Sequence, residues 1–161
     1  MSNISKAFDH GKAFIGFATA GDPDLEASRR VMLEMARGGC DLIEIGIPFS
    51  DPIAEGPVIQ EADLRALNAG TTTDKVFEMT AKLSAETDVP LVYMTYLNVL
   101  FKYGYEKFLK NAKDCGISGV VVPDLPFEEK GELQSVAEKY DIDVISLVAP
   151  TSEQRIQMIA K

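Results

Sequence analysis

The chain has 161 residues, a mean hydropathy of zero, and 46% hydrophobic against 25% charged residues, which is the composition of one ordinary globular domain. Its 16 basic and 25 acidic residues leave a net charge of −9, and a field of that sign repels nucleic acid. No apolar run approaches the roughly 20 residues of a membrane span. Residues 1–8 also lack the apolar segment of a secretory signal. We therefore expect a cytoplasmic protein that binds neither nucleic acid nor membrane.

Short apolar runs alternate with longer amphipathic segments along the chain. The apolar runs predict five strands, at residues 13–19, 42–47, 91–95, 119–122 and 143–148. Helices are predicted between them, ending near residues 38, 68, 86, 115 and 140, with a last helix after residue 151. For the first helix, Asp22 is the expected N-cap and Pro23 the expected first residue. Strands that are apolar on both faces and separated by helices predict a parallel α/β sheet.

Two features favour a (β/α)₈ (TIM) barrel over a doubly wound sheet. Residues 36–48 and 112–123 share one pattern, in which a helix end, a glycine, a strand and a proline follow one another. No glycine-rich dinucleotide-binding motif follows the first strand. A complete barrel needs eight strands and typically about 250 residues. We therefore expect residues 1–161 to form a single domain, an incomplete barrel that is the N-terminal portion of a longer one.

The content of histidine and cysteine restricts the chemistry. His10 is the single histidine and lies in a polar segment, so a site built on several histidines is excluded and no metal is expected. Cys40 and Cys115 lack metal-ligand spacing and are expected to be buried thiols in a reducing compartment. Acid–base chemistry would have to come from carboxylates or tyrosines.

Glu44 is the most informative carboxylate of the chain. It lies between Ile43 and Ile45 in an otherwise apolar strand, so its side chain points away from both neighbours. The interior of a barrel is costly for a lone carboxylate. A catalytic acid or base, one half of a structural ion pair, and an exposed position in a frayed strand all fit the pattern.

Other candidates follow the strands, at the end where parallel barrels place their active sites. Glu55 ends a proline-rich loop at residues 48–57, either as a carboxylate favoured by the dipole of the next helix or as a second carboxylate facing Glu44. For Tyr96 two interpretations stay open, a residue of the packed core and a residue of the site. Asp124 is expected to fix a turn.

Residues 44–60, EIGIPFSDPIAEGPVIQ, closely resemble the signature of tryptophan synthase alpha subunits. Three further matches, TAGDP at 19–23, YLN at 96–98 and VPDLP at 122–126, follow in the family's order. The resemblance implies a TIM barrel that cleaves indole-3-glycerol phosphate to indole and glyceraldehyde 3-phosphate, with no cofactor of its own. It implies that Glu44 is the general acid–base and that Glu55 binds the indole N–H. It places Phe17 and Tyr96 in the substrate pocket.

The resemblance also implies a partner. The loop that carries Asp51 would meet a beta subunit, a pyridoxal-phosphate enzyme that receives the indole, in an alpha2beta2 tetramer. This chain departs from the family by having Glu55 where aspartate is usual, which adds one methylene to the reach of the carboxylate. The family's phosphate-binding loops come later in the barrel than residue 161, so if this chain were the whole protein we would expect very poor substrate affinity.

Three hypotheses follow. The first is an alpha-subunit lyase, and the second is a catalytically inactive half-barrel that only docks on a beta subunit through the Asp51 loop. The third is another phosphate-handling barrel enzyme. Release of indole separates the first from the second.

Overall fold

A computed structural model describes residues 3–159 of the chain, which form five parallel strands in sequential order. The strands are β1 (Ile15–Thr19), β2 (Leu42–Gly46), β3 (Leu91–Met94), β4 (Ile117–Val121) and β5 (Asp143–Ile145). Each strand pairs with the next one in parallel. A doubly wound sheet would reverse its order at a switch point, whereas a barrel keeps it. The predicted arrangement of five parallel strands is confirmed.

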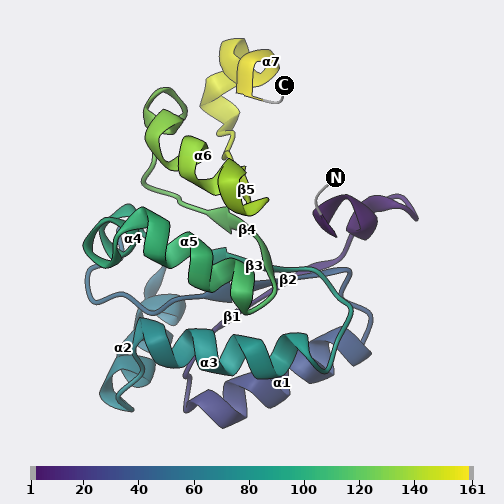
Figure 1. Cartoon of the computed structure of the whole chain (residues 1–161), viewed down its shortest axis with the longest axis vertical. Coiled ribbons are helices and arrows are strands. Elements are labelled where there is room, and N and C mark those ends of the chain that lie inside the picture. The colour runs from purple at the N-terminus through teal and green to yellow at the C-terminus, as the bar shows by residue number, and fades with distance from the viewer. Residues whose placement is uncertain (1–2, 160–161) are drawn as a thin grey trace.

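Helices connect the strands and follow one another along the outside of the sheet (Figure 1). They are α1 (Leu25–Arg37), α2 (Pro57–Asn68), α3 (Thr73–Ser84), α4 (Leu97–Tyr103), α5 (Tyr105–Asp114), α6 (Gly131–Ala137) and α7 (Ile156–Ile159). In this layer α1 contacts α3, α3 contacts α5, and α5 contacts α6. Helix α4 was not predicted, and the expected last helix begins as a 3₁₀ turn at Pro150–Arg155.

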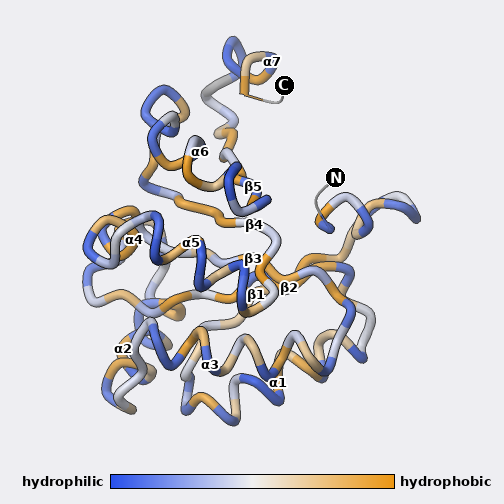
Figure 2. Tube along the Cα trace, viewed as in Figure 1, coloured by the Kyte–Doolittle hydropathy of each residue, from blue (hydrophilic) through white to orange (hydrophobic). Residues whose placement is uncertain are grey.

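The two faces of the sheet have different surroundings. Ile43 and Ile45 of β2 are fully buried in the large hydrophobic cluster beneath the helices. On the opposite face, Leu42 and Val92 pack with Ala7 of the N-terminal 3₁₀ turn (Asn3–Phe8). Hydrophobic residues accordingly follow the strands, whereas the helices alternate hydrophobic and hydrophilic residues (Figure 2). The face with Leu42 and Val92 is the concave face, and the even-numbered residues of β2 belong to it.

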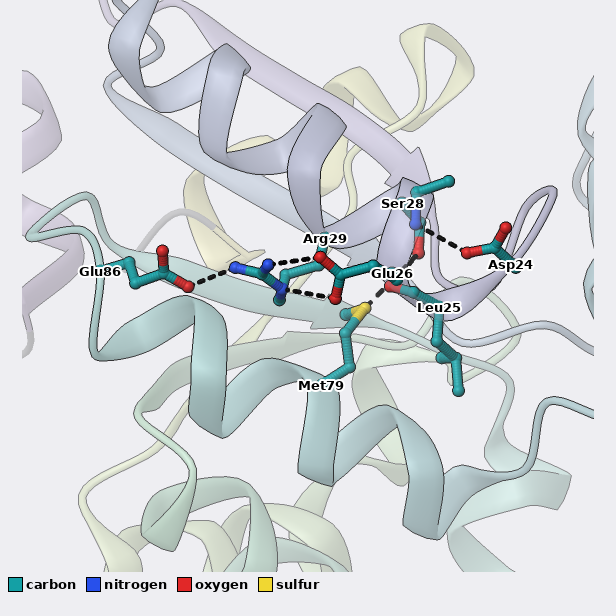
Figure 3. Close-up of polar contacts among 8 residues, drawn as sticks. Asp24, Leu25, Glu26, Ser28, Arg29, Met79 and Glu86 are labelled. Atoms are coloured by element: carbon teal, nitrogen blue, oxygen red, sulfur yellow. Dashed lines mark hydrogen bonds and ion pairs between the residues drawn. The ribbon is translucent and has the colours of Figure 1, made fainter.

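The start of α1 corrects one prediction. The N-cap is Asp24, not Asp22, and its carboxylate accepts the Ala27 backbone N–H at 2.7 Å. Helix α1 therefore begins at Leu25, two residues later than predicted from Pro23. Arg29, in the next turn, reaches carboxylates of α1 and of the segment after α3, which ties the two helices together (Figure 3). Since Asp22 is released from capping, its carboxylate is free for another contact.

Candidate active site

Glu44 occupies the concave face in the middle of β2. Its register partners are Phe17 of β1 and Val92 of β3, so these three side chains share one face. The Glu44 side chain is half-buried, and within residues 3–159 it forms neither an ion pair nor a hydrogen bond. Burial raises the pKa of its carboxyl above the ordinary value of 4.5. A carboxyl held in this way keeps its proton to higher pH than a solvated glutamate, which suits a group that both gives and takes a proton.

Phe17 lies beside Glu44 because β2 has a glycine two residues further on. A Cβ atom at Gly46 would stand 2.6 Å from Cζ of the Phe17 ring, closer than side-chain atoms approach each other. Gly46 therefore leaves the space that the aromatic ring occupies. The result is an apolar ring next to a lone carboxyl on the concave face. Phe17, predicted as a substrate-binding residue, lies where it could do so.

Glu55 and Tyr96 are in direct contact. The Tyr96 hydroxyl donates to Oε2 of Glu55 and accepts the Ala54 backbone N–H at 2.8 Å. The ring of Tyr96 packs against Phe49, with ring centroids 5.2 Å apart. Burial and the hydrogen bond to Glu55 raise the pKa of Tyr96 to about 12. Tyr96 therefore holds both ends of the loop between β2 and α2, and it packs as well as binds.

One acidic residue near Glu55 was missed by the sequence analysis. Asp63 of α2 is 6% exposed and lines a cavity of about 10 Å³ together with Phe17, Glu55 and Tyr96. Burial raises its pKa from 3.8 to about 6, and the charge of Glu55 adds to the effect, whereas the Phe49 backbone N–H opposes it. The pattern of α2 gives no sign of this, since an aspartate beside Glu61 and Arg65 reads as part of a solvated helix face.

Asp22 and Arg65 connect the loop after β1 to helix α2. Nε and Nη2 of Arg65 donate to the two carboxylate oxygens of Asp22 at 2.8 and 2.9 Å. This bidentate pair fastens the loop after β1 to α2. It lowers the pKa of Asp22 and raises that of Arg65.

The loop after β2 also forms the wall of an outward-facing groove. Asp51 is exposed there, and the Ser50 hydroxyl donates to its carboxylate at 2.5 Å. The groove has a volume of about 510 Å³ and continues over Asn98 and Lys102 at α4. Asp51 is therefore presented to the outside, away from the cavity beside Glu55.

The remaining candidates, Asp124, His10 and the two cysteines, lie apart from Glu44 and Glu55. The Asp124 carboxylate accepts the Leu97 backbone N–H at 2.9 Å, so it joins its own turn to the start of α4. His10 is exposed in a turn, and Cys40 and Cys115 are buried free thiols, as predicted. Within residues 3–159, no helix is long and apolar enough to cross a membrane.

Glu44 lies in the middle of β2 and Glu55 in the loop that follows β2, and Phe17 is a neighbour of both residues. The cavity beside Glu55 has room for about one water molecule, so a larger molecule could reach these residues only from the concave face. One carboxyl there can give and take protons, while the second can accept a hydrogen bond from the substrate.

Comparison with known proteins gives one consistent result. Residues 4–161 match the family model described as tryptophan synthase alpha chain. The tryptophan synthase alpha chain of Lacticaseibacillus casei is 50% identical over all of this chain and 60% of its own length. That of Alkaliphilus metalliredigens is 51% identical over 97% of this chain and 58% of its own.

Solved structures agree with the sequence comparison. The alpha subunit from Legionella pneumophila superposes with a TM-score of 0.92 at 37% identity, covering 99% of this chain and 63% of that one. A chain of the tryptophan synthase a2b2 complex from Pyrococcus furiosus gives 0.87 at 36% identity, covering 91% and 63%. The chain thus spans about 60% of the length of its curated relatives and folds as part of their TIM barrel. On these grounds the chain belongs to the tryptophan synthase alpha chain family.

Proposed function

We propose that this chain, a single domain corresponding to the N-terminal part of an alpha-subunit barrel, carries the acid–base residues for cleavage of indole-3-glycerol phosphate. The products are indole and glyceraldehyde 3-phosphate, and the step belongs to tryptophan biosynthesis. The observation that carries the proposal is Glu44, a half-buried carboxyl of raised pKa beside the Phe17 ring on the concave face. Membership of the family supports the same reaction.

Glu44 serves as both acid and base in this proposal. Burial raises its pKa and so favours the protonated carboxyl, whose proton goes to C3 of the indole ring. The carboxylate that results then accepts the proton of the side-chain hydroxyl, as the bond between the indole and the glycerol phosphate carbon breaks. Glu44 is thereby reprotonated, and neither a metal nor a cofactor of this chain takes part in the proton transfers.

Glu55 and Phe17 position the substrate. As C3 is protonated, positive charge develops on the indole ring, and the Glu55 carboxylate accepts the indole N–H and stabilises this charge. Tyr96 fixes the direction of Glu55 through its hydroxyl. The ring of Phe17 covers one face of the indole.

A partner follows from the exposed side of the same loop. Asp51 and the groove of about 510 Å³ over Asn98 would contact a tryptophan synthase beta subunit, which carries the pyridoxal phosphate. The related chain from Pyrococcus furiosus comes from an a2b2 complex, which supports an alpha2beta2 assembly. The free buried thiols fit the reducing cytoplasm.

The second candidate function is docking without catalysis, in which the chain only alters the activity of the beta subunit. It is favoured by the exposed groove at Asp51, which lies apart from the cavity beside Glu55. The two candidates differ in whether indole is released.

The test measures indole release from indole-3-glycerol phosphate by the chain, alone and with a beta subunit. We expect Glu44→Gln to abolish release without changing the circular dichroism spectrum, because the amide is nearly isosteric but cannot exchange a proton. Glu78→Gln, at an exposed glutamate of α3, is the matched control and should behave as the wild type. Near-normal turnover by Glu44→Gln would refute the catalytic role. Binding to the beta subunit without any indole from the wild type would establish the docking alternative.

A further inference from the structure

Asp63 carries a carboxyl group in an unusual place. Within residues 3–159 it is the one acidic side chain in the buried class, at 6% exposure. Arg65 lies two residues further along α2, but its guanidinium is engaged with both carboxylate oxygens of Asp22. The Phe49 backbone N–H donates to the Asp63 carboxylate, but a buried carboxylate without a cation of its own is costly. A role in the site beside it would account for this position.

The cavity next to Asp63 is polar on several sides. Its lining includes Asp63, Glu55, Tyr96 and Thr95, so two carboxyl groups and two hydroxyls surround a space of about 10 Å³. Thr95 is 1% exposed, and in the described part of the chain its hydroxyl has no hydrogen-bond partner. No cation lines the cavity. The charge on one carboxyl must therefore affect the other directly.

We propose that Asp63 is a positioning residue, whose negative charge holds the Glu55 carboxylate against the Tyr96 hydroxyl by repulsion across this cavity. When Asp63 is protonated, the repulsion ends and Glu55 is free to turn toward Asp63 and Thr95. This proposal rests on the proposed function for one point, the role of Glu55 toward the substrate. The contact between Glu55 and Tyr96 exists in the chain whether or not the chain is catalytic.

Burial and the charged groups around Asp63 set the pH at which its carboxyl loses its proton. Asp22 faces it from the loop after β1 and Glu55 from the loop after β2, and both raise its pKa in addition to burial. The Phe49 backbone N–H favours the charged form of Asp63, and the Arg65 guanidinium is paired with Asp22. The pKa of Asp63 is consequently about 6, so Glu55 is held at neutral pH and released in mildly acidic solution.

The Ala54 backbone amide reports on this contact, since it donates to the same Tyr96 hydroxyl that binds Glu55. In the chain without substrate, we expect the Ala54 amide NMR shift to change with a midpoint near pH 6. Asp63→Asn, which keeps the shape but carries no charge, should abolish that midpoint. Glu61→Gln, at an exposed glutamate of the same helix, should retain it.

A reciprocal measurement keeps the test independent of any one variant. Glu55→Gln removes a like charge, so the midpoint of the Asp63 carboxyl carbon should move to lower pH, by about 0.5 pH unit or more. An Ala54 shift that is flat between pH 5 and 7, or that titrates equally in Asp63→Asn, would overturn the proposal. So would an Asp63 midpoint that Glu55→Gln leaves in place.

The pH dependence of indole release gives a third measurement, which would not change if Asp63 only stabilised the fold. If the chain releases indole, Asp63→Asn should lose the decline in rate below pH 6, while Glu61→Gln should keep it. A wild-type chain that releases no indole contradicts the proposed function. In that case the Ala54 and Asp63 titrations, which need no turnover, still decide the role of Asp63.

Discussion

The Tyr96 hydroxyl makes the two contacts that fasten the loop after β2, and Tyr96→Phe removes both while leaving the ring in place. The ring keeps its packing on Phe49, with centroids 5.2 Å apart, so no cavity is created. Only the hydrogen bonds to Glu55 and from the Ala54 N–H are lost. The variant therefore measures the hydroxyl alone.

The expected cost follows from the partners. A hydrogen bond to a charged group contributes roughly 1.5–3 kcal/mol and a neutral one about 0.5–1.5 kcal/mol. Glu55 is partly exposed, so water replaces part of what the carboxylate loses, and the lower ends of both ranges apply. The free energy of unfolding should fall by about 2 kcal/mol. With a urea m value of about 2 kcal/mol per M, the midpoint of unfolding falls by about 1 M.

The assay is urea unfolding followed by circular dichroism at pH 7.5, with Tyr105→Phe as the matched control. Tyr105 is half-buried whereas Tyr96 is 4% exposed, and the Tyr105 hydroxyl has no hydrogen bond to the described residues, so its loss should cost less than about 0.5 kcal/mol. Equal midpoints for the two variants would refute the reasoning. Hydrogen exchange at Ala54 gives a second check, because its protection should fall in Tyr96→Phe alone.

Two further predictions concern the same region. Gly46→Ala would place a methyl group 2.6 Å from Cζ of Phe17, and because that ring faces the open side of the sheet, displacing it should cost about 1 kcal/mol; an unchanged urea midpoint with unchanged Phe17 ring NMR shifts would contradict this. The pKa of Asp63 is raised on folding from 3.8 to about 6, so the unfolded chain binds fewer protons in this range and stability falls as pH rises from about 4 to 6. Asp63→Asn should therefore be more stable than the wild type above pH 6, by roughly 2–3 kcal/mol, and should lose this pH dependence. Parallel stability curves for the two proteins between pH 4 and 7 would show that the charge of Asp63 has no such cost.

Much of the fold is visible in local patterns. Each strand was predicted within a few residues, since apolar runs long enough to be buried on both faces leave few other structures. Glu44 could be singled out because it is the one charged residue in the apolar strand β2. Its register with Phe17 and Val92 agrees with a side chain that points away from Ile43 and Ile45.

The N-cap of α1 was harder to predict from the sequence. Asp22 and Asp24 both precede the helix, and either one fits an N-cap before the contacts are known. Arg65, 43 residues further along, binds Asp22 and so leaves Asp24 to cap α1. A local pattern contains no information about such a distant partner.

By itself the sequence determined the alternation of strands and helices, the parallel sheet, the family, and the side of β2 from which Glu44 projects. These follow from hydrophobic periodicity and a long specific motif, both of which are local along the chain. The tertiary structure alone decided that Tyr96 holds Glu55, 41 residues away, and that Asp63 is buried beside them. The physical reason is that parallel strands bring loops from separate units to one end of the sheet, and the partners of a side chain there are set by packing between units.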